Sequence, residues 1–238
     1  MAANKILKQL FAKLWTKEAR KDWLLLLLAV ACIGLAFVFG HLGSEVHEGE
    51  LKSIDETVRQ WVVTHRTRAG TAVFSVITQL GSRGVLALLG VFVAWRLFRE
   101  NKRVWLLLAI CALASAEIVA ILKRGFDITR PAGGIAAGLG GSFPSGHASG
   151  SMSVAVVLAY IALRKGKPPW VVVTSAVLFV LLVGISRVFL DVHWTSDVIG
   201  GWLVGGAFGA GCCALYEWLQ RRSFPDWRSR SSERESKR

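Results

Sequence analysis

The sequence predicts an all-α integral membrane protein, built as a bundle of six membrane-spanning helices. Of its 238 residues, 53% are hydrophobic, and the mean hydropathy is +0.46. This composition is typical of a chain that lies in a bilayer. Six apolar runs each approach the length needed to cross roughly 30 Å of hydrocarbon. The predicted spans are 23–40, 84–98, 104–122, 148–163, 170–185 and 198–216.

The first span, 23–40, follows a basic segment, as the apolar part of a signal peptide does. It is long for a signal peptide, and no convincing small-residue cleavage site comes after it. We therefore expect it to be kept as a membrane anchor. The residues before it, 1–22, are predicted to form a basic cytoplasmic segment.

An amphipathic helix is predicted between the first and second spans. Ser53 and Glu56 have the spacing of a capping box, and Ile54, Val58 and Trp61 follow at helical spacing. We expect this helix to lie at the outer membrane interface. There it is either a solvated cap over the bundle or a gate for a substrate.

The second span, 84–98, is short for a membrane crossing. The residues from Thr71 to Leu80 are also apolar, but Gly81 and Ser82 separate them from it. Two arrangements follow from this pattern. Either one tilted helix begins near Thr71, or a short re-entrant piece precedes the span.

The net charge of +13 is distributed unevenly along the chain. Most of the 29 Lys and Arg residues lie before the first span, after the sixth, and in the links that join spans two to three and four to five. Because cytoplasmic loops carry the excess of Lys and Arg, both termini are predicted to be cytoplasmic. The basic surplus is then a topology signal, and nucleic acid is not an expected partner. The link between spans one and two carries five acidic residues: Glu45, Glu48, Glu50, Asp55 and Glu56.

The six spans are predicted to form one domain, 23–219. The Arg- and Ser-rich end, 220–238, is predicted to be a disordered basic cytoplasmic tail. Within the domain, 124–146 is rich in glycine and is predicted to be an irregular loop. A loop this long is usually functional or disordered, and this one joins two charged motifs.

Three blocks of polar residues stand beside the ends of apolar runs. Membranes tolerate ionisable side chains only where they pair, face water or carry a function. With the N-terminus inside, the adjoining span ends all lie on the outer face, so a bundle can bring the blocks into one pocket. The blocks are Lys123-x6-Arg130-Pro131, Pro144-Ser145-Gly146-His147 and Ser186-Arg187-x5-His193-x3-Asp197.

The cations of these blocks suit a phosphate group. Arg130 and Arg187 each offer a planar fork that matches phosphate oxygens, and Lys123 supplies a compact charge. A single Lys or Arg at a helix end more often only extends toward the headgroups. Ser145 and Gly146 open the fourth span, where free backbone N–H groups bind anions, although a Pro-Ser pair is also a simple helix start.

The two histidines suggest a reaction. His193 and Asp197 are four residues apart, so on one helix the carboxylate can hold one ring nitrogen and leave the other free to attack. Asp197 or Ser196 can also cap the sixth span. Near a phosphate, His193 and His147 can divide the work. One attacks phosphorus, and the other protonates the leaving oxygen and then activates water. Three cations stabilise the equatorial oxygens and repel a divalent ion, so neither a metal nor another cofactor is expected.

These three blocks resemble the signature of the type 2 phosphatidic acid phosphatase (PAP2) superfamily of membrane lipid phosphatases, and every fixed position matches. The resemblance implies that His193 is the nucleophile, His147 the general acid, and Asp197 the partner that orients His193. It also implies a set of residues that bind the phosphate without a metal. These are Lys123, Arg130, Ser145, Gly146 and Arg187.

The resemblance implies a phosphatase that removes a terminal phosphate from a membrane lipid. We expect it in a bacterial cytoplasmic membrane, with the site facing the periplasm or the cell exterior. Undecaprenyl diphosphate is the preferred substrate, and phosphatidylglycerophosphate, phosphatidate and lipid A phosphates are alternatives. Vanadate-dependent halide oxidation is a weaker alternative, because six spans argue against it. A transporter that selects an anion or a lipid is the non-catalytic alternative.

Overall fold

The computed structural model describes residues 17–98, 102–134 and 140–222, and these form eight helices without a strand. The prediction of an all-α protein is therefore confirmed. The predicted N-terminal segment and C-terminal tail fall largely outside the described residues. The helices are α2 (Lys17–Glu48), α3 (Lys52–His65), α4 (Arg68–Gln79), α5 (Arg83–Phe98), α6 (Lys102–Phe126), α7 (Gly146–Arg164), α8 (Pro169–Phe189) and α9 (Thr195–Arg222).

Four of the described helices, α2, α7, α8 and α9, are long and apolar enough to cross a membrane. The pair α4 and α5 bends by 43° at its junction and makes a fifth span if it crosses as one unit. The predicted span at 104–122 falls within α6, so the count of six stays a prediction. The outward faces carry many exposed large hydrophobic side chains, as a surface facing lipid requires.

The junction between α4 and α5 is fixed by close packing at Gly81. A Cβ atom at Gly81 would overlap the side chain of Val183 in α8 and come within 3.4 Å of the His147 side chain. The two helices are therefore separate, and the backbone of their junction lies directly against α7 and α8. The break that Gly81 and Ser82 suggested in the sequence becomes one wall of the region around His147.

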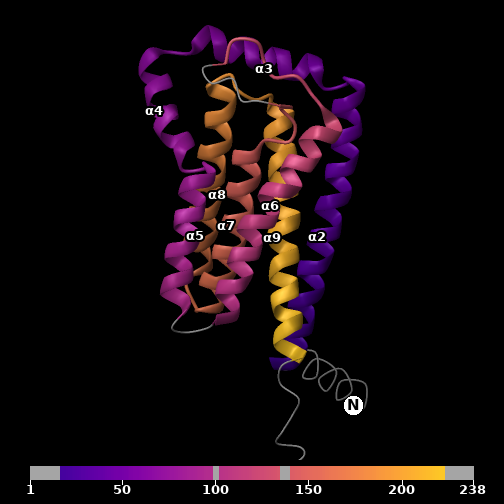
Figure 1. Ribbon diagram of the computed structural model, residues 1–238, viewed down its shortest axis with the longest axis vertical. Helices are drawn as coiled ribbons and strands as arrows, with labels where there is room; N and C mark the ends of the chain where they lie inside the picture. Colours follow the sequence, from indigo (N-terminus) through magenta and orange to yellow (C-terminus); the bar gives the residue numbers. More distant parts are fainter. Residues whose placement is uncertain (1–16, 99–101, 135–139, 223–238) are drawn as a thin grey trace, which may run out of the picture.

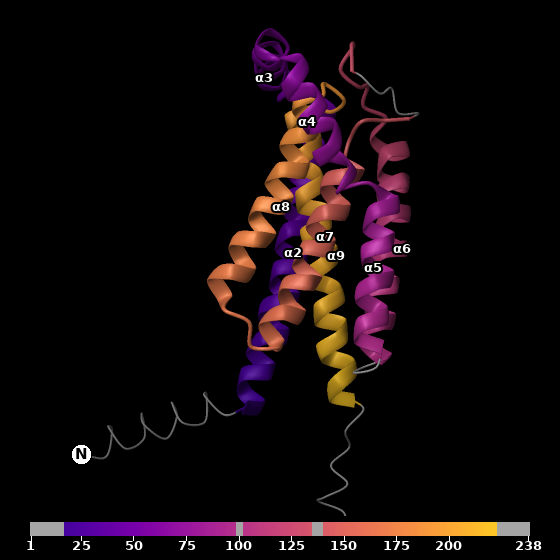
Figure 2. The same ribbon diagram turned by 90° about the vertical axis from the view of Figure 1, so that its left-hand side faces the viewer.

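The helix α3 lies across one end of the bundle, at a steep angle to the long helices (Figure 1). Figures 1 and 2 both place the described ends of α2 and α9 at the opposite end. The capping box predicted for α3 is wrong, because this helix already begins at Lys52 and its N-cap residue, Leu51, makes no side-chain cap. The buried face also differs from the predicted apolar face: Asp55 and Val62 are buried, whereas Ile54 and Trp61 are exposed.

The helices α7 and α9 form the most extensive helix contact of the bundle. Glycines of α9 at four-residue spacing meet the backbone of α7, and a Cβ atom at Gly205 would overlap the carbonyl oxygen of Ser149. Small residues let two helix backbones approach closely in a membrane. This packing sets the position of α7 relative to α9. The residues of this ladder are Gly201, Gly205 and Gly209 on α9, Ser149 and Ser153 on α7, and Ser145 at the N-cap of α7.

An aromatic cluster fixes the segment that leads into α7. Phe143 is fully buried, and its ring stacks on Phe39 of α2 at a centroid distance of 5.5 Å. Its ring also makes an edge-to-face contact with Phe126 at a centroid distance of 4.9 Å and lies against Gly200 of α9. Burying one large aromatic side chain contributes on the order of 2 kcal/mol. The start of α7 is therefore held against α2, α6 and α9 together.

Replacing Gly205 with alanine should destabilise the protein. The added methyl group must push α7 away from α9, and overpacking of this kind typically costs about 1–3 kcal/mol. Thermal unfolding in detergent should show a lower midpoint for Gly205→Ala. The matched control is Gly34→Ala on α2, where nothing lies within 4 Å of the new Cβ atom. The control should be neutral or stabilised by up to about 1 kcal/mol, and equal midpoints for the two variants would contradict this packing.

Candidate active site

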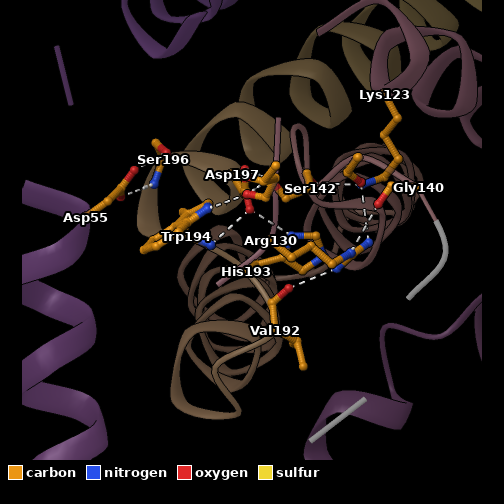
Figure 3. A network of polar contacts seen from close by, with 12 residues as sticks. Asp55, Lys123, Arg130, Gly140, Ser142, Val192, His193, Trp194, Ser196 and Asp197 are labelled. Atoms are coloured by element: carbon orange, nitrogen blue, oxygen red, sulfur yellow. Dashed lines mark hydrogen bonds and ion pairs between the residues drawn. The ribbon is translucent and has the colours of Figure 1, made fainter. Parts of the chain in front are cut away.

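The three sequence blocks meet at the end of the bundle that α3 covers. The last turn of α6 supplies Lys123, the following loop supplies Arg130, and the segment from Leu190 into α9 supplies His193 and Asp197. Figure 3 shows these side chains in one continuous polar network, with Ser142 between them. The described structure therefore brings together residues that lie up to 74 positions apart in the chain.

His193 and Asp197 form a buried pair. Nδ1 of His193 lies 3.0 Å from Oδ2 of Asp197, and the two residues are 4% and 0% exposed. The backbone N–H of Trp194 donates to the same oxygen at 2.9 Å, and the Ser142 hydroxyl donates to Oδ1 at 3.2 Å. An ionised carboxylate only accepts hydrogen bonds, so Nδ1 must carry the proton. This leaves the lone pair of His193 on Nε2.

Arg130 covers that free nitrogen. Its Nη1 lies 3.2 Å from Nε2 of His193 and donates to the carbonyl oxygen of Val192 at 2.9 Å. Burial and the nearby charges of Lys123, Arg130 and Arg187 hold the pKa of His193 well below its usual value of 6.5. The imidazole is therefore neutral at pH 7, and its Nε2 points at a guanidinium group.

Lys123 holds the loop that precedes α7. Its Nζ donates to the carbonyl oxygens of Gly141 and Ser142 at 2.8 and 2.7 Å. Arg130 adds weaker contacts to Gly140 and Gly141 at 3.4 Å. Both cations thus shape the loop and also face the cluster around His193.

The start of α7 differs from the sequence prediction in one respect. We expected the backbone N–H of Ser145 to bind an anion, but it donates to the backbone carbonyl of Asp197 at 2.9 Å. The hydroxyl of Ser145 is buried and has no hydrogen-bond partner among the described residues. The Ser145 hydroxyl is therefore the group of this residue that can serve a ligand. Its backbone joins α7 to α9.

His147 and Arg187 occupy the side of the site nearest α4. His147 is partly buried against Gly81 and makes no hydrogen bond within the described residues. Arg187 donates from Nη1 to the Thr78 hydroxyl of α4 at 2.7 Å, while its buried Nε has no partner in the described structure. The charge of Arg187 acts on both histidines. This side of the site thus combines an available imidazole with an available guanidinium N–H.

Two residues of α3 hold the segment that carries His193, and neither was recognised in the sequence. Asp55 accepts two hydrogen bonds from Ser196, one from the backbone N–H at 2.9 Å and one from the hydroxyl. Arg59 binds both carboxylate oxygens of Asp191 at 2.7 and 3.0 Å. Burial raises the pKa of Asp55, and the hydrogen bonds from Ser196 act in the opposite direction. The Asp55 contact is visible at the edge of Figure 3.

These contacts decide how α9 begins. The sequence left open whether Ser196 or Asp197 caps the sixth span. In the structure, the backbone N–H of Ser196 in the first turn of α9 is bound by Asp55 from another helix, and Asp197 accepts from Trp194. The negative charge of Asp55 near the N-terminus of α9 is also favourable because of the helix dipole. In the sequence, Asp55 was noted only as one of five acidic residues between the first two spans.

Comparison with known proteins finds similar sequences. Residues 103–222 match the sequence pattern of the PAP2 superfamily. Phosphatidylglycerophosphatase B of Bacillus subtilis (strain 168) is 30% identical over 179 residues, which cover 73% of this chain and 88% of that protein. An undecaprenyl-diphosphatase of Sulfolobus acidocaldarius is 39% identical over 64 residues, but covers 27% of this chain and 28% of its own.

Two solved structures have folds similar to that of this chain. A crystal structure of a transmembrane PAP2-type phosphatidylglycerolphosphate phosphatase from Bacillus subtilis matches 83% of this chain and 99% of its own, with a TM-score of 0.73 and 26% identity. A crystal structure of Aquifex aeolicus LpxE matches 66% and 93%, with a TM-score of 0.53 and 25% identity. The match to the Bacillus subtilis structure includes nearly all of that chain.

Replacing Asp55 with alanine should destabilise the protein by about 2–4 kcal/mol, because two hydrogen bonds to a charged group are lost and Ser196 keeps buried, unpaired donors. Thermal unfolding in detergent measures the change. Asp55→Asn should lose less, since an amide can still pair with both groups of Ser196. The control, Glu56→Ala, removes the neighbouring exposed carboxylate and should stay within about 0.5 kcal/mol of the wild type. A loss for Glu56→Ala as large as that for Asp55→Ala would show that α3 is merely sensitive to substitution.

Proposed function

This chain belongs to the PAP2 superfamily of membrane lipid phosphatases, and we propose that it hydrolyses its substrate through a phosphohistidine at His193. The observation that carries this proposal is the orientation of the His193 ring. Its Nδ1 is bound to Asp197, and its Nε2 faces the cations. Binding alone would not require a neutral imidazole held in this way by a buried carboxylate. A transporter that selects an anion would therefore leave this pair unexplained.

In the first proposed step, Nε2 of His193 attacks phosphorus. A bond forms between Nε2 and phosphorus, the bond from phosphorus to the leaving oxygen breaks, and His147 gives a proton to that oxygen. Asp197 stabilises the positive charge that develops on the attacking ring. In the second step, water attacks the phosphohistidine while His147 accepts its proton, which releases phosphate and restores both histidines.

Arg130 has two tasks in this mechanism. Its Nη1 lies 3.2 Å from Nε2 of His193, in the place that phosphorus must take. A phosphate oxygen can replace the imidazole as its partner, so Arg130 then moves from the nucleophile to the charge that develops on the substrate. Lys123, Arg187, the Ser145 hydroxyl and the backbone N–H of Gly146 complete the proposed phosphate site. Fixed donors of this kind lower the barrier of phosphoryl transfer without a metal ion.

We propose phosphatidylglycerophosphate as the substrate. The sequence had led us to prefer undecaprenyl diphosphate and to keep phosphatidylglycerophosphate as an alternative. The relative that aligns with most of this chain is named a phosphatidylglycerophosphatase, whereas the undecaprenyl-diphosphatase aligns with about a quarter of it. The balance of the comparisons supports phosphatidylglycerophosphate. Undecaprenyl diphosphate remains the second candidate, since it also presents a terminal phosphate at the membrane surface.

We further propose that the site faces the periplasm or cell exterior of a bacterial cytoplasmic membrane and that both termini are cytoplasmic. The distribution of basic residues supports this orientation. The basic segments lie next to the described ends of α2 and α9, away from α3, and positive residues favour the cytoplasmic side. In this arrangement residues 23–219 form the phosphatase domain, and 1–22 and 220–238 are basic cytoplasmic extensions.

Replacing His193 with alanine should abolish phosphate release from phosphatidylglycerophosphate, with kcat lowered by at least about a thousandfold, because the nucleophile is removed. The assay uses purified protein in detergent. The control, His41→Ala, removes an exposed histidine of α2 and should keep the wild-type rate. Wild-type activity should also persist in EDTA. Undiminished activity of folded His193→Ala, or loss of activity in EDTA, would contradict the proposed mechanism.

A cysteine placed at Ala132 should react with a membrane-impermeant maleimide in intact cells. Ala132 is exposed in the loop between α6 and α7, at the end of the bundle proposed to lie outside. The wild type, which keeps its four native cysteines, gives the background signal. Labelling that appears only after the cells are lysed would reverse the proposed orientation.

A further inference from the structure

Arg83 is a cation beside the proposed active site that none of the three sequence blocks contains. It is the first residue of α5, directly after the junction at Gly81. Within the part of the chain that the structure describes, its exposed side chain makes neither a hydrogen bond nor an ion pair. Its charge nevertheless acts on both His147 and Lys123. Arg83 is therefore close to the site and is not used to hold the fold together.

A small cavity of about 80 Å³ connects Arg83 with the start of α7. Its lining has two polar side chains, Arg83 and Ser115, and it includes Gly146, one of the proposed phosphate-binding residues. The remainder of the lining is mostly apolar and comes from α5, α6 and α7. These residues are Leu86, Ala87, Ala116, Val119 and Val154. The cavity thus extends from the phosphate site into the apolar part of the bundle.

The position of His147 indicates which part of the substrate lies on the side of Arg83. In the proposed mechanism His147 gives its proton to the leaving oxygen, so the leaving group must lie beside His147. The ring of His147 packs against Gly81, two residues before Arg83. The charge of Arg83 therefore lies on the side of the site that the leaving group occupies, whereas Arg130 and Lys123 surround the phosphate that is transferred.

Each of the other cations of the site already donates at least one hydrogen bond to the protein. Lys123 and Arg130 donate to backbone carbonyl oxygens, and Arg187 donates to Thr78. Arg83 has no such contact among the described residues, so its exposed guanidinium is available to a ligand. Its planar fork matches the two oxygens of a phosphate group. These features indicate an anion on the substrate rather than a structural ion pair.

We propose that Arg83 binds a second phosphate group, one that belongs to the leaving group of the substrate. This inference rests on the proposed function and specifies its substrate class. Phosphatidylglycerophosphate carries such a group as its phosphodiester, and a lipid diphosphate carries it as the phosphate attached to the lipid. The leaving group of phosphatidate is diacylglycerol, which has no charge for Arg83 to bind. Arg83 thus favours substrates with two phosphates over lipid monophosphates.

The test compares three lipids with the purified full-length protein: phosphatidylglycerophosphate, undecaprenyl diphosphate and phosphatidate. The variant Arg83→Gln should lower the ratio of kcat/KM for either two-phosphate lipid to that for phosphatidate by about tenfold, the lower end of what a hydrogen bond to a charged group provides. Arg83→Lys keeps the charge and should recover part of the ratio. The control Arg68→Gln changes an exposed arginine that is also the first residue of its helix, and it should leave the ratio unchanged.

The outcomes separate this inference from the function on which it rests. An equal loss on all three lipids, or no loss on any of them, would overturn the role of Arg83 while leaving the phosphatase assignment intact. A wild-type protein that releases phosphate from none of the three lipids would overturn the proposed function, and the inference with it. Size-exclusion profiles of the variants in detergent establish that each one is folded.

Discussion

The carboxylate of Asp197 is the group on which the remaining site geometry depends. It is completely buried, and it accepts hydrogen bonds from His193, from the backbone of Trp194 and from Ser142. The backbone carbonyl of the same residue accepts from Ser145 at the start of α7. One residue therefore joins the loop after α6, the start of α7 and the segment that carries His193. A buried charge is stable only when its hydrogen bonds are satisfied, so these segments cannot separate without a large cost.

The surrounding fold keeps this carboxylate in place from three sides. The glycine ladder brings the backbone of α9 against α7, the aromatic cluster around Phe143 holds the loop before α7, and Asp55 of α3 holds the first turn of α9. These elements act on Asp197 through packing and backbone contacts rather than through the reacting groups. The helix α3 is thus more than a cover over the bundle. Its salt bridge from Arg59 to Asp191 fixes the short segment between α8 and α9 that positions His193.

Much of the site was predictable because its signals are local. The four-residue spacing of His193 and Asp197 places both on one side of a helix start, and the proline and glycines before His147 mark the start of α7. The contacts of Asp55 and Arg59 were not predictable in this way. Each joins residues more than 130 positions apart, and no periodicity in the chain specifies which buried donor an acidic residue of α3 will meet. The backbone N–H of Ser145 was assigned to an anion for a similar reason, since its partner, the Asp197 carbonyl, is set by the packing of α7 on α9.

The most direct test of this account is to locate phosphate on the protein during the first turnover. Wild-type protein is mixed with phosphatidylglycerophosphate, quenched in alkali, where phosphohistidine survives, digested, and analysed by mass spectrometry. The arrangement around Asp197 predicts phosphate on His193, because Nε2 of that ring is the nitrogen left free by the buried pair. Phosphate on His147 would contradict the account. Product formation under the same conditions without any phosphorylated histidine would contradict it as well.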